Sequence, residues 1–210
     1  MKTTIATFNS DYTEVGKIIF KNLFKLLIAG LFIGVFYAND GLVAAFLGLY
    51  LILSISKRWK KKLPDRKIYL AGAVISGFLG FCCELWGIAN EFWQYHDLEG
   101  HRQIPYWLPF AWALAFTYVY KLEKEIFEAM NRPPLSTKMV IALGVAMVFP
   151  TFGEIITINL GVWTYSWPYQ VLGVPVLAIF LLMVFHTGVN LIMSWICKYQ
   201  GWKNIVFNHK

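Results

Sequence analysis

Residues 138–160 read KMVIALGVAMVFPTFGEIITINL, and this stretch decides the fold class. Between its ends it carries one ionisable side chain, Glu154, in a run long enough to cross a bilayer, which needs roughly 20 mostly apolar residues. Similar apolar stretches cover residues 18–37, 41–56, 68–92, 106–120 and 171–197. An open sheet cannot cross lipid, and no barrel-type alternation is visible. The sequence therefore predicts an all-α, polytopic membrane protein with six transmembrane helices.

The composition supports this class. Of the 210 residues, 58% are hydrophobic and only 15% are charged, and the mean hydropathy is +0.53. A soluble domain is about half apolar and a quarter charged, so the composition excludes a soluble enzyme, a DNA-binding domain and a disordered tail. Cys82, Cys83 and Cys197 lie in apolar segments without disulfide or zinc-site spacing, and we expect them to act as small packing residues.

The basic residues predict the orientation. Seven of them fall within residues 57–67, whereas Arg102 is alone on the opposite side of the predicted topology. By the positive-inside rule, residues 1–17 form a cytoplasmic segment, 18–197 a single membrane domain and 198–210 a cytoplasmic tail. We expect an integral protein of a bacterial cytoplasmic membrane and no nucleic-acid partner. Residues 57–67 are a candidate site for anionic lipid headgroups, although the topology signal alone is the simpler interpretation.

An internal repeat has an offset of 70 residues. The pattern E-x8-W-x-Y-x9-P occurs twice, through the pairs Glu84/Glu154, Trp93/Trp163, Tyr95/Tyr165 and Pro105/Pro175. The copies, about 68–121 and 138–191, each contain two predicted spans with the same direction. This pattern predicts a parallel two-helix repeat related by an axis along the membrane normal, with the third and fourth spans matching the fifth and sixth. We expect Glu84 and Glu154 to approach each other near that axis.

The two carboxyls suggest proton chemistry. A charged residue at a helix centre costs roughly 2.5–3.5 kcal/mol, and no Lys or Arg lies at the depth of Glu84 or Glu154. We therefore expect one or both to be protonated near neutral pH. A carboxylic acid in an apolar pocket can protonate an alkene, aromatic faces can stabilise the resulting cation, and a second carboxyl can remove a proton or activate water. The candidate substrate-binding residues are Trp86, Trp93, Tyr95, Trp112, Trp163, Tyr165, His186 and Asn190.

Simpler interpretations exist for each of these residues. Intramembrane acids also serve as hydrogen-bonded clasps between helices, and Trp and Tyr gather in interfacial belts. His186 is either a base or a polar clasp. His96 and His101, with acids nearby, match no familiar metal site, and no His cluster, phosphate loop or nucleophile elbow is present. The sequence predicts no metal and no cofactor.

Two segments resemble a known family. The run Glu84-Leu-Trp-Gly87 with Trp93-Gln-Tyr95 and Pro105 resembles the first half of the membrane carotenoid-biosynthesis proteins that hydrate acyclic carotenoid ends. The run from Glu154 through Gly161-Val-Trp163-Thr-Tyr165 to Gly173-Val-Pro175 looks like their second half. The resemblance covers about residues 80–190 and extends to the small membrane lycopene cyclases. It departs from the family at Glu154-Ile155, where the family usually has Asp-Pro, and at Glu91, where the family tends to have Gly.

The resemblance implies acid-initiated, cofactor-independent chemistry on an alkene of a carotenoid or other isoprenoid lipid, by hydration, cyclisation or isomerisation. Glu84 and Glu154 are the expected catalytic pair, with the two roles unassigned. One alternative is a small proton-coupled transporter or lipid-binding protein with its site at the repeat interface, for which discontinuous helices are typical. Another is a structural membrane subunit in which both acids are clasps between helices.

Overall fold

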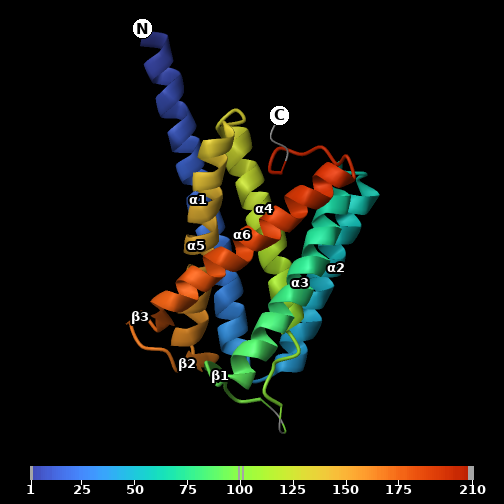
Figure 1. Cartoon of the computed structure of the whole chain (residues 1–210), viewed down its shortest axis with the longest axis vertical. Coiled ribbons are helices and arrows are strands. Elements are labelled where there is room, and N and C mark those ends of the chain that lie inside the picture. Colours follow the sequence, from blue (N-terminus) through green and yellow to red (C-terminus); the bar gives the residue numbers. More distant parts are fainter. Residues whose placement is uncertain (1, 99, 101, 208–210) are drawn as a thin grey trace.

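Six helices form the bundle in the part of the chain that the computed structural model describes, namely residues 2–98, 100 and 102–207, with side chains from residue 13 onward (Figure 1). They are α1 (Lys2–Phe36), α2 (Asp40–Lys60), α3 (Arg66–Ala89), α4 (Leu108–Ala129), α5 (Leu135–Asn159) and α6 (Val176–Tyr199). The short strands are β1 (Trp93–Tyr95), β2 (Trp163–Tyr165), β3 (Gln170–Val171) and β4 (Val174–Pro175). Both termini lie at one end of the bundle, and β1, β2 and β3 lie at the other (Figure 1).

Five of the six described helices are long and apolar enough to cross a membrane: α1 over residues 13–36, α2, α3, α5 and α6. This confirms the membrane class. The fourth predicted span needs correction, because α4 begins at Leu108 and runs nine residues beyond Tyr120 to Ala129. The added turns, KLEKEIFEA, are rich in charge, so α4 is not among the apolar spans.

The position of α4 explains its polarity. It packs against α1, α2, α3 and α5, and its Phe116, Tyr120 and Leu122 are almost fully buried. Since neighbouring helices surround α4, much of its surface faces protein, where polar side chains can find partners.

Close helix contacts use small residues. Gly30 and Gly34 of α1 face α5, and a methyl group built on Gly30 would lie 2.9 Å from Ile156 Cγ2. One built on Gly34 would overlap Leu160. This GxxxG pair therefore forms a close contact between α1 and α5. The cysteines are packed less than expected, because Cys82 and Cys83 are exposed on α3 and only Cys197 is buried.

Helices α3 and α5 end in the same way. After α3, the amide of Glu91 donates to Ile88 O and that of Phe92 to Gly87 O, both at 2.9 Å. After α5, the residues 70 positions later repeat both bonds, at 2.9 and 3.1 Å. The residue at the turn has positive φ in each case, +58° at Glu91 and +84° at Gly161. Both ends are thus left-handed caps that turn the chain across the end of the bundle.

An antiparallel ribbon joins these two turns. Strand β1 pairs with β2 in the register Trp93–Tyr165, Gln94–Thr164 and Tyr95–Trp163. Side chains alternate between the faces of a strand, so the W-x-Y spacing places all four aromatic residues on one face. Gln94 and Thr164, on the other face, are exposed. The ribbon was not predicted, because each strand is only three residues long and its partner is 70 residues away.

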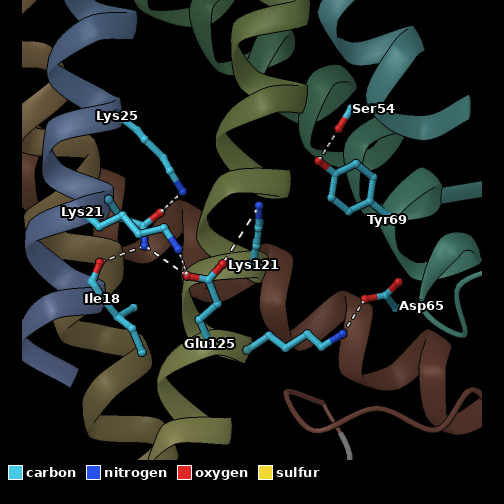
Figure 2. A network of polar contacts seen from close by, with 10 residues as sticks. Ile18, Lys21, Lys25, Ser54, Asp65, Tyr69, Lys121 and Glu125 are labelled. Carbon is cyan, nitrogen blue, oxygen red and sulfur yellow. Dashed lines mark hydrogen bonds and ion pairs between the residues drawn. The ribbon is translucent and has the colours of Figure 1, made fainter. Parts of the chain in front are cut away.

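Polar contacts tie the helices together at the end that holds the termini (Figure 2). The Glu125 carboxylate of α4 lies 3.6 Å from Lys21 Nζ and 4.0 Å from Lys121 Nζ, and it accepts a 3.4 Å bond from Asn22 of α1. Asp65, at the start of α3, has a carboxylate 2.6 Å from the Arg58 guanidinium and 2.9 Å from Lys124 Nζ. Asp65 thereby links α2, α3 and α4.

Replacing Asp65 with Asn is expected to destabilise the fold by about 1–3 kcal/mol, less than for a fully buried ion pair because Arg58 and Lys124 are near the surface. Burial alone would raise the pKa of Asp65, but the Lys124 hydrogen bond and the Arg58 and Lys124 charges outweigh burial and lower it. A lowered folded-state pKa means that the stabilisation is fully present above the unfolded value of about 3.9 and decreases from there as the pH falls toward and through the lower folded-state pKa.

The measurement is thermal unfolding in detergent between pH 6 and pH 3. The gap between the unfolding temperatures of the wild type and Asp65→Asn should narrow toward the acid end, while Glu128→Gln, at an exposed carboxylate, serves as the control. A gap that stays constant over this range would contradict the role given to Asp65. The Asp65 side chain makes no hydrogen bond as helix cap, so loss of a cap does not confound the comparison.

Candidate functional site

A cavity of about 180 Å³ lies beneath the β1–β2 ribbon. All four aromatic side chains on the inner face of the ribbon line it. Helices α1, α3, α4, α5 and α6 supply the rest of the wall, which is mainly apolar. Glu84 of α3 and Glu154 of α5 are the only carboxyl-bearing side chains among the described lining residues. The two predicted acids therefore share one hollow beneath the ribbon. Strands β1 and β2 of that ribbon lie at the end of the bundle opposite the termini (Figure 1).

Three aromatic donors surround the Glu84 carboxyl. Trp93 Nε1 donates to Oε2 at 2.8 Å, the Tyr95 hydroxyl donates to the same oxygen at 3.0 Å, and Trp112 Nε1 donates to Oε1 at 3.0 Å. Glu84 is only 7% exposed. An indole N–H can donate but cannot accept, so two of the three partners accommodate only an accepting oxygen.

The surroundings of Glu154 are different. Its described hydrogen-bond donor is the Tyr165 hydroxyl, at 3.0 Å from Oε2 and 3.2 Å from Oε1. A phenol can donate or accept, so this contact tolerates either protonation state of the carboxyl. Glu154 is also half-buried, whereas Glu84 is buried. The two acids occupy equivalent places on their helices but have unequal partners.

Both tyrosines remain protonated in this environment. Burial and the nearby Glu84 charge raise the pKa of Tyr95 well above its usual value. Burial likewise raises the pKa of Tyr165 well above its usual value. Each phenol therefore keeps its proton and remains available for a hydrogen bond to its carboxyl.

Two further polar atoms of lining residues have no hydrogen-bond partner among the described residues. They are Nε2 of His186 on α6 and Nε1 of Trp107, just before α4. These side chains are only 2% and 3% exposed. An unpaired buried polar group costs about 1–3 kcal/mol, which makes the cavity suited to a ligand or water that bonds to these atoms.

Most of the predicted site residues come together here. Both acids line the cavity, with Trp93, Tyr95, Trp112, Trp163, Tyr165 and His186. Trp86 does not, because two residues after Glu84 its side chain lies roughly 200° around the helix, where it is 53% exposed and packs on Phe92. Asn190 also lies elsewhere: it is one turn beyond His186 and donates to Glu123 Oε1 at 3.0 Å.

Sequence reasoning missed one buried group, Glu123. Trp107, which also lines the cavity, has no equivalent in the repeat pattern. Glu123 is completely buried in α4, with Oε2 unpartnered among the described residues, although its neighbours in the sequence suggest an exposed helix. The spacing of Glu123 offered a signal: it lies three residues after Tyr120 and seven after Phe116, which places all three side chains on one face of the helix.

The arrangement can hold an apolar group between two carboxyls and aromatic rings. A cavity of this size has room for a group slightly larger than benzene, which fills an engineered cavity of about 150 Å³. Helix α5 stays continuous through Pro150, which lines the cavity, so the helix break that is typical of a transporter site is not found at this position.

No protein family, curated protein or solved structure matches this chain.

Proposed function

We propose that this protein is a membrane enzyme that performs acid-initiated, cofactor-independent chemistry on an alkene group of a carotenoid or other isoprenoid lipid. One observation carries the proposal: two carboxyls with unequal hydrogen-bond partners line a single aromatic cavity. Pairs of acids whose environments favour different protonation states are typical of sites that use one as acid and the other as base.

Glu84 is the base in this proposal. All three of its partners can donate at once only if both carboxyl oxygens accept, which is the case for the ionised form. A protonated Glu84 would have to donate its own hydrogen, and among these partners only the Tyr95 oxygen could accept it. The donor set therefore favours a carboxylate at Glu84, although a charge in such a position is otherwise costly.

Glu154 is the acid. With the Tyr165 phenol as its described partner, it has less support for a negative charge than Glu84. A neutral carboxylic acid is the cheaper form in an apolar wall, and the phenol can accept its hydrogen or donate to its carbonyl oxygen. Glu154 is thus the proton source.

The proposed reaction has two steps. The alkene π pair forms a C–H bond with the Glu154 proton, which leaves a carbocation and the Glu154 carboxylate. Glu84 then takes a proton from a neighbouring carbon, which restores a double bond and gives an isomer or, after ring closure, a cyclic product. In the hydration variant, a water oxygen bonds to the cation while Glu84 takes a proton from that water. The carboxyls end with exchanged protonation states, and proton transfer through solvent or substrate resets them.

Aromatic side chains support the cation. The electron-rich faces of Trp and Tyr attract a cation within about 6 Å of the ring centroid. Trp93, Tyr95, Trp163 and Tyr165 present their rings to the cavity from the ribbon, and Trp112 does so from α4. The volume of about 180 Å³ holds one end of an isoprenoid, and the remainder of the chain extends outside it.

We also propose that the two halves arose by duplication. Three observations support this: α3 and α5 end in the same pattern of backbone hydrogen bonds, β1 pairs with β2 about Gln94 and Thr164, and each half contributes one acid to the cavity. We propose the orientation from the positive-inside rule: the end of the bundle that holds the termini faces the cytoplasm, and the cavity lies in the outer half of the membrane.

Lipid analysis tests the substrate class. The full chain is purified from its native membrane and the bound lipids are identified by mass spectrometry. We expect an isoprenoid with at least one alkene end, enriched over the bulk membrane. In the variant Ala115→Phe, which fills the cavity, this lipid should be lost. Ala45→Phe, at an exposed position of α2, is the matched control and should retain it. Phospholipid alone in the wild type, or equal isoprenoid content in both variants, would contradict the proposal.

A further inference from the structure

A second and larger cleft lies at the end of the bundle that holds the termini. Its volume is about 890 Å³. It is built from the α2–α3 loop, α4, the α4–α5 loop, the start of α5 and the segment after α6. The cleft is separate from the cavity that holds Glu84 and Glu154, because the two share no lining residue among those described.

The lining of this cleft is positively charged. Lys124, Arg132, Lys138 and Lys203 face two carboxylates, Asp65 and Glu128, which leaves a net charge of +2. Asp65 is also held by Arg58 at 2.6 Å, so its charge is already compensated. Arg132 and Lys203 are exposed, and both are available to a ligand that enters from the aqueous side.

A buried hydroxyl without a partner lines the same cleft. Tyr120 is 1% exposed, and its hydroxyl has no hydrogen-bond partner among the described residues. Its ring is fixed between Phe116 and Phe207, with centroid distances of 5.9 and 5.6 Å. An unsatisfied donor in the wall of a cleft with a net positive charge is suited to an anionic oxygen.

The start of α5 adds backbone donors. The 25-residue helix begins at Leu135, directly after Pro134, and no side chain caps it. The first amides of a helix lack partners within the helix, and its dipole favours negative charge at this end. Pro134 and Leu135 both line the cleft.

We propose that this cleft binds a phosphate group, through the Tyr120 hydroxyl, the Arg132 and Lys203 side chains and the first amides of α5. Such a group is carried by an anionic phospholipid headgroup or by free phosphate. Basic pockets between helices at the cytoplasmic side of membrane proteins suit lipid phosphates. This site is distinct from the general attraction of anionic headgroups to the basic residues 57–67, because it depends on the Tyr120, Arg132 and Lys203 side chains that line the cleft.

Binding measurements on the full chain test the proposal. The protein is titrated in detergent with inorganic phosphate, and in a second experiment it is placed in nanodiscs with increasing phosphatidylglycerol in phosphatidylcholine; binding is followed by calorimetry and by the unfolding temperature. Saturable binding of either ligand supports the site. Binding of phosphate identifies a soluble ligand, whereas response to phosphatidylglycerol alone identifies a lipid headgroup. Failure of both would overturn the proposal.

Three variants locate the binding. Tyr120→Phe keeps the stacked ring and removes only the hydroxyl, and it should weaken binding about tenfold. Lys203→Gln should weaken it by a similar factor. Lys61→Gln removes the same charge from an exposed position at the same end that does not line the cleft, and it should change the dissociation constant less than twofold. Equal effects of Lys203→Gln and Lys61→Gln, or no effect of Tyr120→Phe in a normally folded variant, would overturn the assignment to this cleft.

Discussion

Glu154→Gln is expected to lower the turnover of the isoprenoid substrate by a factor of about 10²–10⁴ while the unfolding temperature stays close to that of the wild type. An amide cannot release a proton at neutral pH, so the first step of the proposed reaction loses its acid. The Tyr165 hydroxyl can still donate to the amide oxygen of Gln, which preserves the local contact. Turnover is measured as the isomerised or hydrated product by mass spectrometry.

Glu84→Gln is expected to lose turnover by a similar factor and, unlike Glu154→Gln, to lose stability as well. Three donors point at the Glu84 oxygens, and the NH₂ group of Gln would face at least one of them. A buried donor without a partner costs about 1–3 kcal/mol, which should appear as a lower unfolding temperature. The difference in stability between the variants therefore reports the different surroundings of the two carboxyls.

Glu91→Gln is the control for both variants, because Glu91 is an exposed acid at the same end of the bundle and does not line the cavity. It should keep full turnover. Retained turnover in both cavity variants would rule out the acid-pair mechanism. If Glu154→Gln were the less stable variant, the assignment of acid and base would have to be reversed or abandoned. Destabilisation of both variants, with turnover intact in the molecules that remain folded, would favour a structural clasp.

Gly80→Ala and Gly87→Ala are expected to lower both the stability and the turnover of the protein. A methyl group on Gly80 would overlap the Trp112 indole, and one on Gly87 would overlap the Trp93 indole. These are the two indoles that donate to Glu84. Overpacking of this kind costs about 1–3 kcal/mol, and displacement of a positioning group by 1 Å can cost about 10² in rate.

The measurement combines thermal unfolding with turnover. Gly188→Ala is the matched control, because Gly188 is a helical glycine of α6 with open space around the position of a Cβ. Alanine there should be neutral or slightly stabilising, since Ala exceeds Gly in helix propensity by up to about 1 kcal/mol. Wild-type stability and turnover in Gly80→Ala or Gly87→Ala would show that the indoles are free to move and that their bonds to Glu84 are dispensable.

The predicted spans differ from the observed helices where contacts between helices, and not local composition, determine which residues are buried. The apolar stretches of α1, α2, α3, α5 and α6 were recognisable from the sequence because membrane insertion depends on composition summed over about 20 residues. For α4 this measure was misleading, since its second half is rich in charge and the helix packs against α1, α2, α3 and α5. Glu123 is the clearest case: in KLEKEIFE it looks like a surface acid, yet it is completely buried beside Asn190.

The candidate site was partly recognisable. The repeated W-x-Y pattern identified the four aromatic residues of the ribbon. Because alternate residues of a strand point to the same face, the Trp and the Tyr of each pattern both line the cavity. Trp86 was included because it is close to Glu84 in the sequence, but the helix turns it away. The donors on Glu84 come from the ribbon and from α4, so their convergence depends on three separate elements.

Hydropathy and residue spacing were enough to predict the membrane class, the positions of most helices and the two acids at matching places in an E-x8-W-x-Y pattern, because both are properties of short segments. Three features depend on the tertiary fold: both acids share one cavity, Glu84 accepts from three donors among the described residues while Glu154 accepts from one, and Tyr120 lines a basic cleft. These features arise where side chains from elements far apart in the chain meet. Their geometry follows from the packing of whole helices, and no local pattern of residues encodes it.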